Sequence, residues 1–355
     1  MPRAIAENVR LFHSRHDDTM SFDVTLSPSG KRFTVEDDES VLEAAIRQGV
    51  GLPYGCRSGR CGSCMSTLIE GEVGYPDSDP SALEMEAADK CLPCVAYALS
   101  DLTLEIREVE SAADIEPRML PCRVQQVDHL AHDVVRLMLK LPEDQRLQFQ
   151  AGQYLDFVLA DGSKRAFSIA NAPEDDQLIE LHIRHVDGGK FTDWVWSQMK
   201  DRAILRIEAP HGGFVLDQDS PRPWLFIGGG TGFAPLKSQI EHSFHKGTTR
   251  PMALYWGVRS RRDLYLPDLP QQWADEHPNF RHVPVLSEPD ADWSGRSGFV
   301  HEAVLQDIPN LPDYDIYMAG PPIMVKSARD AFLAKGVPDA QMHYDAFEYA
   351  AAKGK

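Results

Sequence analysis

The sequence predicts a multidomain protein that joins α+β and α/β modules in one chain. Its 355 residues suffice for two to three domains. A hairpin, a helix and a cysteine-rich loop near the start predict a small β-grasp module. Short strand-like segments between turn residues predict an antiparallel β-barrel in the middle, and strands that alternate with helices predict a parallel sheet in the last third.

Composition and charge restrict the classes of partner. A hydrophobic content of 43% and a charged content of 25% are ordinary for a soluble globular protein. No apolar run approaches the roughly 20 residues that span a membrane. The formal net charge of -18 argues against nucleic acid or an anionic membrane as partner. The six cysteines, three of which are closely spaced, predict a reducing cytoplasm. Separately, we expect a monomer.

The N-terminal quarter begins with a polar stretch and continues as a β-grasp. Residues 1–19 lack apolar periodicity, so we expect a disordered extension, with a helical docking arm as the alternative. Segments 22–26 and 32–35 predict a hairpin, and Ser40 with Glu43 forms a capping box that begins a helix. The remaining elements expected here are a strand at 66–73, a helix at 81–88 and a strand at 102–109.

A cysteine-rich loop follows the first helix. Three cysteines fall within nine residues, spaced C-x4-C-x2-C: Cys56, Cys61 and Cys64. This spacing matches the first three ligands of the plant-type [2Fe–2S] pattern, and the glycines between them suit a loop whose backbone N–H groups point at sulfur. A fourth ligand must come from downstream, where Cys91 and Cys94 are the nearby candidates.

A structural zinc site is the alternative for this loop. Cys61 with Cys64, and Cys91 with Cys94, form two C-x2-C pairs. Zinc leaves Cys56 and its neighbouring glycines unexplained, and the spacer between the pairs is longer than usual. Disulfides are disfavoured because the cysteines are clustered and the chain lacks a secretory signal.

The loop resembles plant-type ferredoxin domains, in which the last cysteine opens a run that ends in Ser-Asp. Cys94 stands at the family's offset before Ser100 and Asp101, whereas Cys91 does not. The resemblance therefore implies that the metal ligands are Cys56, Cys61, Cys64 and Cys94. It also implies a ferredoxin domain over residues 20–109, followed by an acidic linker over 110–119.

The barrel is expected over residues 120–220. Its strands are predicted at 122–128, 134–140, 154–158, 165–170, 179–185 and 204–208, with one helix at 191–199. The segment R-A-F-S resembles the Arg-x-Tyr/Phe-Ser motif of the ferredoxin–NADP reductase superfamily. The resemblance implies that Arg165 pairs with the flavin pyrophosphate, Phe167 flanks the flavin and Ser168 contacts its reactive edge.

A glycine-rich turn in the barrel supplies a second flavin contact. Gly189, Lys190 and Thr192 lie where this turn opens a helix, and backbone N–H groups there suit an anion such as the same pyrophosphate. A plain strand-to-helix connection is the alternative. His182, in the segment L-H-I-R-H-V, is also expected among the FAD-binding residues.

The parallel-sheet module is expected over residues 221–355. Strands are predicted at 224–227, 252–256, 280–286, 315–318 and 342–347, and helices at 234–245, 269–275, 300–305 and 324–335. The turn G-G-G-T-G-F-A-P follows the first strand and opens the first helix, as a phosphate-binding turn does. It resembles the turn of the same superfamily that binds the nicotinamide cofactor, which implies roles for Gly229, Thr231, Gly232 and Pro235.

Three further positions complete the predicted nicotinamide site. Arg259 follows the second strand near the expected adenosine, and although it could grip the 2'-phosphate of NADPH, the pattern favours NADH. Gly320 and Pro321 resemble the family's C-G-P-P-x-M turn, with Ala319 in place of the cysteine that assists hydride transfer in relatives. Phe347 is expected to shield the flavin face, with a frayed tail as the alternative.

The order of these motifs resembles three-domain ferredoxin–flavin–nicotinamide reductases over residues 20–350. The resemblance implies an NAD(P)H-dependent reductase that passes electrons through FAD and a 2Fe-2S cluster to a partner protein, a Rieske or di-iron oxygenase. Ser168 and Phe347 would act in the reaction itself. The segments at 168–173, 181–186 and 345–348 are most similar to the reductases of CDP-6-deoxy-hexose 3-deoxygenation, whose partner is a pyridoxamine-phosphate dehydratase. A redox sensor with low turnover is the alternative of another class.

Overall fold

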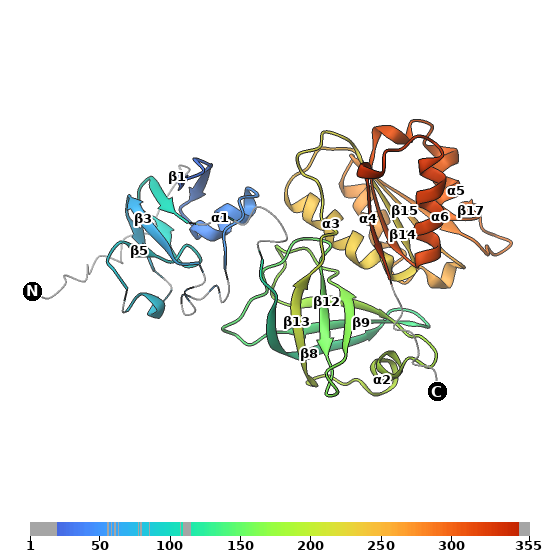
Figure 1. Ribbon diagram of the computed structural model, residues 1–355, viewed down its shortest axis with the longest axis horizontal. Helices are drawn as coiled ribbons and strands as arrows, with labels where there is room; N and C mark the ends of the chain where they lie inside the picture. Colours follow the sequence, from blue (N-terminus) through green and yellow to red (C-terminus); the bar gives the residue numbers. More distant parts are fainter. Residues whose placement is uncertain are drawn as a thin grey trace, which may run out of the picture. The chain divides into compact units, whose positions relative to one another are not determined.

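The computed structural model describes residues 20–54, 57, 59, 62, 64–76, 78, 80–84, 86–106, 108 and 115–347. These residues form two compact units: one that ends at residue 111, and one that carries most of the remaining chain (Figure 1). The predicted extension at 1–19 and residues 110–114 of the predicted linker lie outside the described residues. Among those that are described, no helix combines the length and apolar character needed to span a bilayer.

The described residues of the N-terminal unit form a β-grasp with a five-stranded mixed sheet, a separate two-stranded sheet and one α-helix. Its elements are β1 (Ser21–Ser27), β2 (Arg32–Glu36), α1 (Val41–Arg47), β3 (Ser66–Glu70), β4 (Val73–Gly74), η1 (Ser81–Leu83), β5 (Lys90–Cys91), β6 (Tyr97–Ala98) and β7 (Leu102–Glu105). The sheet order is β2-β1-β7-β3-β5, with β1 and β7 parallel. The predicted capping box is confirmed, since Ser40 and Glu43 bond each other's backbone N–H groups.

Two expectations for this unit were wrong. The helix predicted at 81–88 is a single 3-10 turn, η1. The N–H of Ala82 donates to Gly59 O at 3.1 Å, and most of the segment is exposed, so it lacks the apolar face that would stabilise a longer helix. The strand predicted at 66–73 breaks at Gly71. Its φ of +99° lies in a region that residues with a side chain rarely adopt, and a Cβ there would also lie 2.2 Å from Asp101 O.

The C-terminal unit begins with the predicted antiparallel barrel. Its elements are β8 (Arg118–His129), β9 (Val134–Lys140), β10 (Tyr154–Val158), β11 (Lys164–Ser168), β12 (Ile179–Arg184), α2 (Lys190–Gln198) and β13 (Ile204–His211). The order is β11-β10-β13-β8-β9-β12, and a bridge from Ile169 to Leu181 joins the two edges. Strand β8 starts at Arg118, inside the expected linker.

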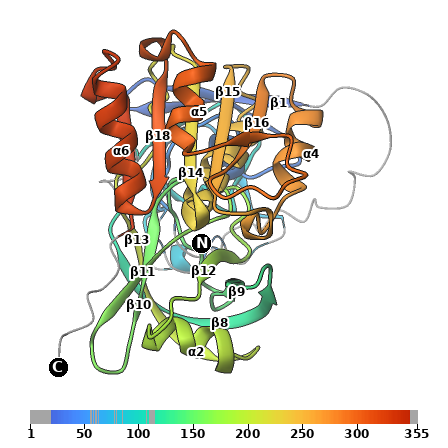
Figure 2. The same cartoon turned by 90° about the vertical axis from the view of Figure 1, so that its right-hand side faces the viewer.

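The rest of this unit is a parallel sheet with helices on both faces (Figure 2). Its longer elements are β14 (Trp224–Gly229), α3 (Phe233–His245), β15 (Met252–Val258), α4 (Leu269–Glu276), β16 (Phe280–Leu286), β17 (Arg296–Ser297), α5 (Val300–Asp307), β18 (Asp315–Gly320), α6 (Pro322–Leu333) and β19 (Met342–Ala346). Single 3-10 turns lie at η3 (Gly230–Gly232), η4 (Arg261–Asp263), η5 (Leu311–Asp313) and η6 (Asp339–Gln341). The order is β17-β16-β15-β14-β18-β19.

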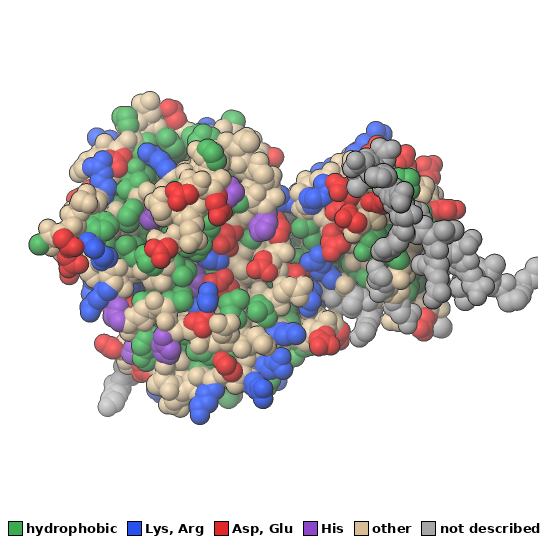
Figure 3. Space-filling model, turned by 180° about the vertical axis from the view of Figure 1, so that it is seen from behind, with side chains coloured by type: hydrophobic (Ala, Val, Ile, Leu, Met, Phe, Trp, Pro, Cys, Tyr) green, Lys and Arg blue, Asp and Glu red, His purple; other side chains and the backbone are tan. Residues whose placement is uncertain are grey.

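The central strands of this sheet are buried on both faces, which explains their continuous apolar runs. Alternate residues of β14 enter two separate cores: Trp224 and Phe226 pack with α3 and α4, whereas Leu225 and Ile227 pack with α5 and α6. Figure 3 shows acidic and basic side chains interspersed over one face of this unit, so the negative net charge does not form a single patch there.

Candidate functional site

The predicted cluster loop adopts the backbone that its glycines allow. Gly59 and Gly62 have φ angles of 74° and 73°, in the left-handed region that L-residues with a side chain rarely adopt. The N–H of Met65 donates to Gly62 O at 2.9 Å and closes the loop. The predicted ligands Cys56 and Cys61 lie outside the described residues, while Cys64 and Cys94 are both buried.

Three thiols gather around Tyr75. Burial and the neighbouring Cys91, Cys64 and Cys94 together raise the pKa of Tyr75 to about 12, against the opposing effect of a hydrogen bond from the N–H of Leu92. The Sγ of Cys91 lies 3.0 Å from the hydroxyl of Ser66, on the neighbouring strand. The choice of Cys94 over Cys91 as the fourth ligand stays a prediction.

The flavin motif lies on β11. Phe167 is half-buried and packs against Phe157 and Phe191, with ring centroids 5.8 and 5.6 Å apart. Arg165 is also half-buried, and its Nη1 donates only to the adjacent Lys164 O in the described structure. Its other guanidinium N–H groups thus remain available to a phosphate.

Ser168, at the end of the same strand, meets a carboxyl from the parallel sheet. Its Oγ donates to Asp345 Oδ2 at 3.4 Å, and Asp345 lies on β19. Burial raises the pKa of Asp345 to about 6, against the opposing effect of the Ser168 hydroxyl. A carboxyl that titrates near neutral pH can hold or release a proton beside the predicted reactive edge of the flavin.

The turn at the start of α2, which is the predicted anion site, is tightly packed. Gly189 caps the helix, and a Cβ there would lie 2.6 Å from Thr192 Oγ1. Thr192 Oγ1 in turn donates to Gly189 O at 3.0 Å and accepts from the N–H of Val186 at 3.2 Å. Lys190 is exposed at the first position of the helix, where its charge is accessible to an anion.

His182 is not available to a ligand, which corrects the role expected for it. Its side chain is fully buried. One ring nitrogen, Nε2, lies 2.9 Å from Glu180 Oε1, and the other, Nδ1, lies 3.0 Å from the hydroxyl of Tyr265. Both nitrogens are thus engaged within the protein.

A cavity of about 550 Å³ opens at the carboxyl ends of β14, β15 and β18, where parallel sheets bind ligands. Three predicted residues line it: Gly229, Arg259 and Pro321. Gly232 and Gly320 pack the two turns together behind this wall, since a Cβ at Gly232 would lie 2.0 Å from Ala319 O. Thr231 and Pro235 do not line the cavity; Thr231 is half-buried and Pro235 is buried in α3.

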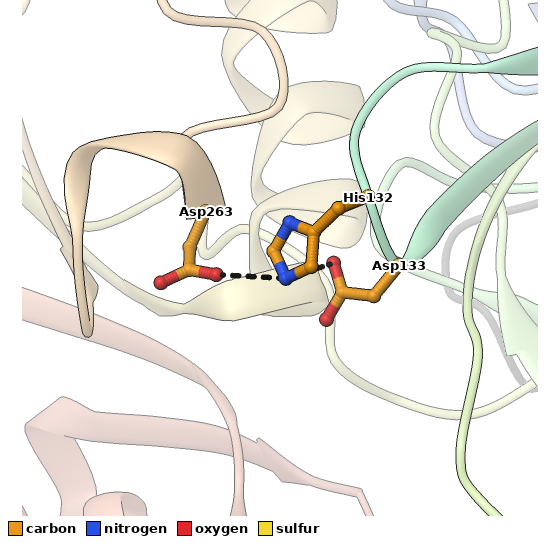
Figure 4. A group of neighbouring side chains, drawn as sticks. All are labelled: His132, Asp133 and Asp263. Atoms are coloured by element: carbon orange, nitrogen blue, oxygen red, sulfur yellow. Dashed lines mark ion pairs between the residues drawn. The ribbon is translucent and has the colours of Figure 1, made fainter.

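The barrel supplies the opposite wall of this cavity. Arg184 and Asp133 line it, with Arg184 Nε 2.9 Å from Asp133 Oδ2. Figure 4 shows the imidazole of His132 between two carboxylates: its Nε2 is 3.5 Å from Asp263 Oδ1 and 3.9 Å from Asp133 Oδ1. Since Asp263 belongs to η4 and the other two precede β9, this group joins the barrel to the parallel sheet at the cavity.

The outer wall carries side chains suited to an adenosine. Phe299 is 60% exposed at the start of α5 and lines the cavity; its ring lies parallel to that of His301, with centroids 5.9 Å apart, and its exposed part suits contact with a purine. Glu288 also lines the cavity, and its N–H donates to Arg259 O at 2.8 Å. Glu288 and the arginine that was expected near the adenosine thus adjoin through their backbones, and both line the cavity.

Sequence reasoning missed Asp345, Arg184, Phe299 and Glu288 as site residues. Asp345 and Arg184 stood inside segments that already suggested a family, but a family motif does not state that Asp345 contacts Ser168 or that Arg184 lines the cavity. Phe347, which was expected at the flavin, is half-buried, and its N–H donates to Gly320 O at 3.0 Å. This bond holds the chain end beside the turn at Gly320.

The residues present fit all three predicted cofactors. Buried thiols in a glycine loop suit an iron–sulfur cluster. Both predicted phosphate turns also need glycine, because a Cβ would lie 2.6 Å from Thr192 Oγ1 at Gly189 and 2.8 Å from Arg184 Nη1 at Gly230. The Gly230 turn thus brings its backbone close to a guanidinium that suits a pyrophosphate.

Three family models match the chain in consecutive segments. They describe a 2Fe-2S iron-sulfur cluster binding domain at residues 24–99, an oxidoreductase FAD-binding domain at 121–216 and an oxidoreductase NAD-binding domain at 226–330.

Curated relatives match over nearly their whole length. The chain is 38% identical to the CDP-6-deoxy-L-threo-D-glycero-4-hexulose-3-dehydrase reductase of Yersinia pestis, over 92% of this chain and 99% of that protein. It is 34% identical to a terephthalate 1,2-dioxygenase reductase component of Comamonas, over 92% and 98%. Among solved structures, the cytochrome P450 reductase GcoB of Amycolatopsis matches with a TM-score of 0.64 and 33% identity, over 93% of this chain and 100% of that one.

Proposed function

Because the chain belongs to the family of NAD(P)H-dependent iron–sulfur flavoprotein reductases, we propose that it passes electrons from NADH through FAD and a [2Fe–2S] cluster to a partner oxygenase. The contact between Ser168 and Asp345 carries the proposal most directly. It joins the end of the predicted flavin strand to the carboxyl edge of the predicted nicotinamide sheet. The two cofactors would therefore lie close enough for direct hydride transfer.

The side chains divide the work between binding and proton handling. When bound, FAD accepts a hydride from the nicotinamide and returns its electrons singly. Arg165 and the α2 terminus would hold the flavin pyrophosphate, and Arg184 with the turn at Gly229 would hold that of the nicotinamide cofactor. Ser168 Oγ and Asp345 Oδ2 would accept the proton that a reduced flavin releases when its two electrons leave one at a time.

The visible spectrum of anaerobically purified protein, before and after one equivalent of NADH, tests the proposal. We expect flavin bands with a broad cluster shoulder, and bleaching in two phases as electrons pass from one group to the other. Flavin bands alone, with zinc found by metal analysis, would contradict the cluster assignment.

The NADH preference gives a separate prediction. Glu288 lines the cavity and adjoins Arg259 through the backbone, so its negative charge would repel the 2'-phosphate of NADPH. We expect Glu288→Gln to lower the KM for NADPH by about tenfold, equivalent to about 1.4 kcal/mol, with little change in the KM for NADH. Initial rates of ferricyanide reduction with each dinucleotide measure both constants.

The matched control is Glu276→Gln, an exposed glutamate at the end of α4 that does not line the cavity. It should leave both constants unchanged. An equal shift in the two variants would show that general charge, and not the position of Glu288, governs the preference. A wild-type protein that already prefers NADPH would refute the NADH assignment.

The acceptor has a second candidate, a dehydratase of CDP-hexulose 3-deoxygenation, because the Yersinia reductase is more similar to this chain than the Comamonas one. NADH-driven reduction of a purified Rieske or di-iron oxygenase, compared with turnover of a pyridoxamine-phosphate dehydratase, separates the two. If NADH is not oxidised in the presence of either partner or of cytochrome c, the result would favour a redox sensor.

A further inference from the structure

One face of β12 presents a row of polar side chains to the parallel-sheet part of the same unit. Glu180, His182 and Arg184 alternate along the strand and therefore point to the same side. The first two are 7% and 4% exposed, which is unusual for ionisable residues. The row of buried ionisable side chains is therefore a candidate for a structural or functional role.

Each member of the row meets a different group. Glu180 Oε2 lies 2.9 Å from the ammonium of Lys237, on α3. His182 bonds Tyr265. Arg184 lies against Gly230, at the dinucleotide turn that immediately precedes α3. The row thus connects the barrel to both ends of one short segment, the turn and the beginning of its helix (Figure 1).

Lys237 is the most constrained residue of this contact. It is 6% exposed, and its Nζ donates to Glu180 Oε2 at 2.9 Å, to Glu241 Oε2 at 2.8 Å and to Ala170 O at 3.3 Å. These three acceptors use all three ammonium protons. Removing the lysine would leave a buried carboxylate uncompensated, so the geometry of the contact is strongly specified.

The proton positions in the row follow from burial. Burial lowers the pKa of His182 and keeps the imidazole neutral, and burial raises the pKa of Tyr265 well above its usual value. Burial would also raise the pKa of Glu180, but His182 and Lys237 hold it at about 2. Neutral His182 therefore donates from Nε2 to the Glu180 carboxylate and accepts at Nδ1 from the Tyr265 hydroxyl.

A second connection runs from Tyr265 to the turn. Its ring packs edge-on against Trp256, with centroids 5.1 Å apart, and Trp256 Nε1 donates to Gly230 O at 3.0 Å. The barrel thus reaches the backbone of Gly230 through Tyr265 and Trp256, and reaches the helix behind it through Lys237. Both connections converge where the dinucleotide pyrophosphate would bind.

We propose that Lys237 is a positioning residue for the nicotinamide cofactor: by binding Glu180, it holds the start of α3 against β12 so that Arg184 lies over the turn at Gly230. The inference rests on the proposed function, because it assumes that the cavity binds the dinucleotide. It assigns no chemical step to Lys237, which acts through the placement of Arg184 and the turn.

The test measures NAD⁺ binding to the oxidised, FAD-loaded full chain by isothermal titration calorimetry, with KM and kcat for NADH and ferricyanide alongside. We expect Lys237→Met to raise the Kd of NAD⁺ and the KM for NADH by about tenfold, and kcat to change less. Glu180→Gln should produce the same pattern. It serves as the test in place of Lys237→Met if the methionine variant does not fold.

The double variant and a matched control separate positioning from general stability. If the two residues act as one unit, Glu180→Gln adds little to Lys237→Met. The control is Glu174→Gln, which removes the charge from another contact between the barrel and α3, to His242 at 2.8 Å near the helix end. It should lower the melting temperature and leave the Kd of NAD⁺ unchanged.

The possible results are distinguishable. An unchanged Kd in Lys237→Met, or an equal rise in Glu174→Gln, overturns the positioning role. Wild-type protein that does not bind NAD⁺ or reduce ferricyanide refutes the proposed function instead.

Discussion

Replacing Cys94 by serine is expected to remove the cluster absorbance and abolish NADH-driven reduction of cytochrome c, a one-electron acceptor. Reduction of ferricyanide should survive, because the flavin can supply that acceptor directly. The physical reason is that a plant-type cluster needs four thiolates and a serine hydroxyl is a poor substitute. Iron and sulfide analysis with the visible spectrum measures the first effect, and steady-state rates with each acceptor measure the second.

The matched control is Cys91→Ser, three residues away in the same C-x2-C pair. The Cys91 thiol lies 3.0 Å from Ser66 Oγ, and a serine can keep that hydrogen bond. We therefore expect Cys91→Ser to retain the cluster and most of its cytochrome c activity. Cluster loss in Cys91→Ser together with cluster retention in Cys94→Ser would reverse the assignment, and loss of bound zinc in either variant would revive the alternative of two C-x2-C pairs.

Local patterns in the sequence were enough to place the parallel sheet. The phosphate turn, for example, follows a run that is apolar from Trp224 to Ile227, and the strand that it predicts is β14. A strand buried on both faces, followed by glycines and then a helix, has few other folded solutions. The helix expected at 81–88 failed for the opposite reason: of its described residues only Ala82 and Leu83 pack against the core, and the rest are exposed.

Contacts between distant segments could not be predicted in the same way. Asp345 is 177 positions from Ser168, and they meet only because β19 pairs with β18 in a register that sets Asp345 beside Ala319. Nothing in the order of residues states that register. The error at His182 has the same origin, since its strand is buried along almost its whole length and the sequence did not reveal which face lies against Lys237 and which against the barrel core.

The carboxyl of Asp345 gives the second large expected effect. We expect Asp345→Asn to reduce ferricyanide turnover at saturating NADH by about a hundredfold, the range in which a positioned acid or base acts. The amide oxygen can still accept from Ser168, so the variant removes the titrating group and keeps the contact. Asp339→Asn, which alters an exposed carboxylate paired with Arg329 just before the same strand, should leave turnover unchanged.

The pH dependence distinguishes a proton acceptor from a structural carboxyl. Because the pKa of Asp345 is about 6, its carboxylate form, which can accept a proton, increases as pH rises through that value. Wild-type turnover should therefore rise between about pH 5 and 7, and the asparagine variant should lack this inflection. An identical inflection in the variant would show that another group is responsible.

The burial of Asp345 also predicts that Asp345→Asn lowers the turnover of the protein but raises its stability at pH 7. The folded pKa of about 6 lies above the value of roughly 3.9 for an unfolded chain, so burial favours the protonated form. Its contribution to stability is complete below about pH 4 and is lost as pH rises through 6, which leaves a cost of about 3 kcal/mol at pH 7. Asp345→Asn removes this cost and should melt at a higher temperature at pH 7 than the wild type, but not at pH 4. A variant that is slower and more stable would identify Asp345 as a charge retained for chemistry, whereas one that is slower and less stable at pH 7 would point to a role in holding β19 in place.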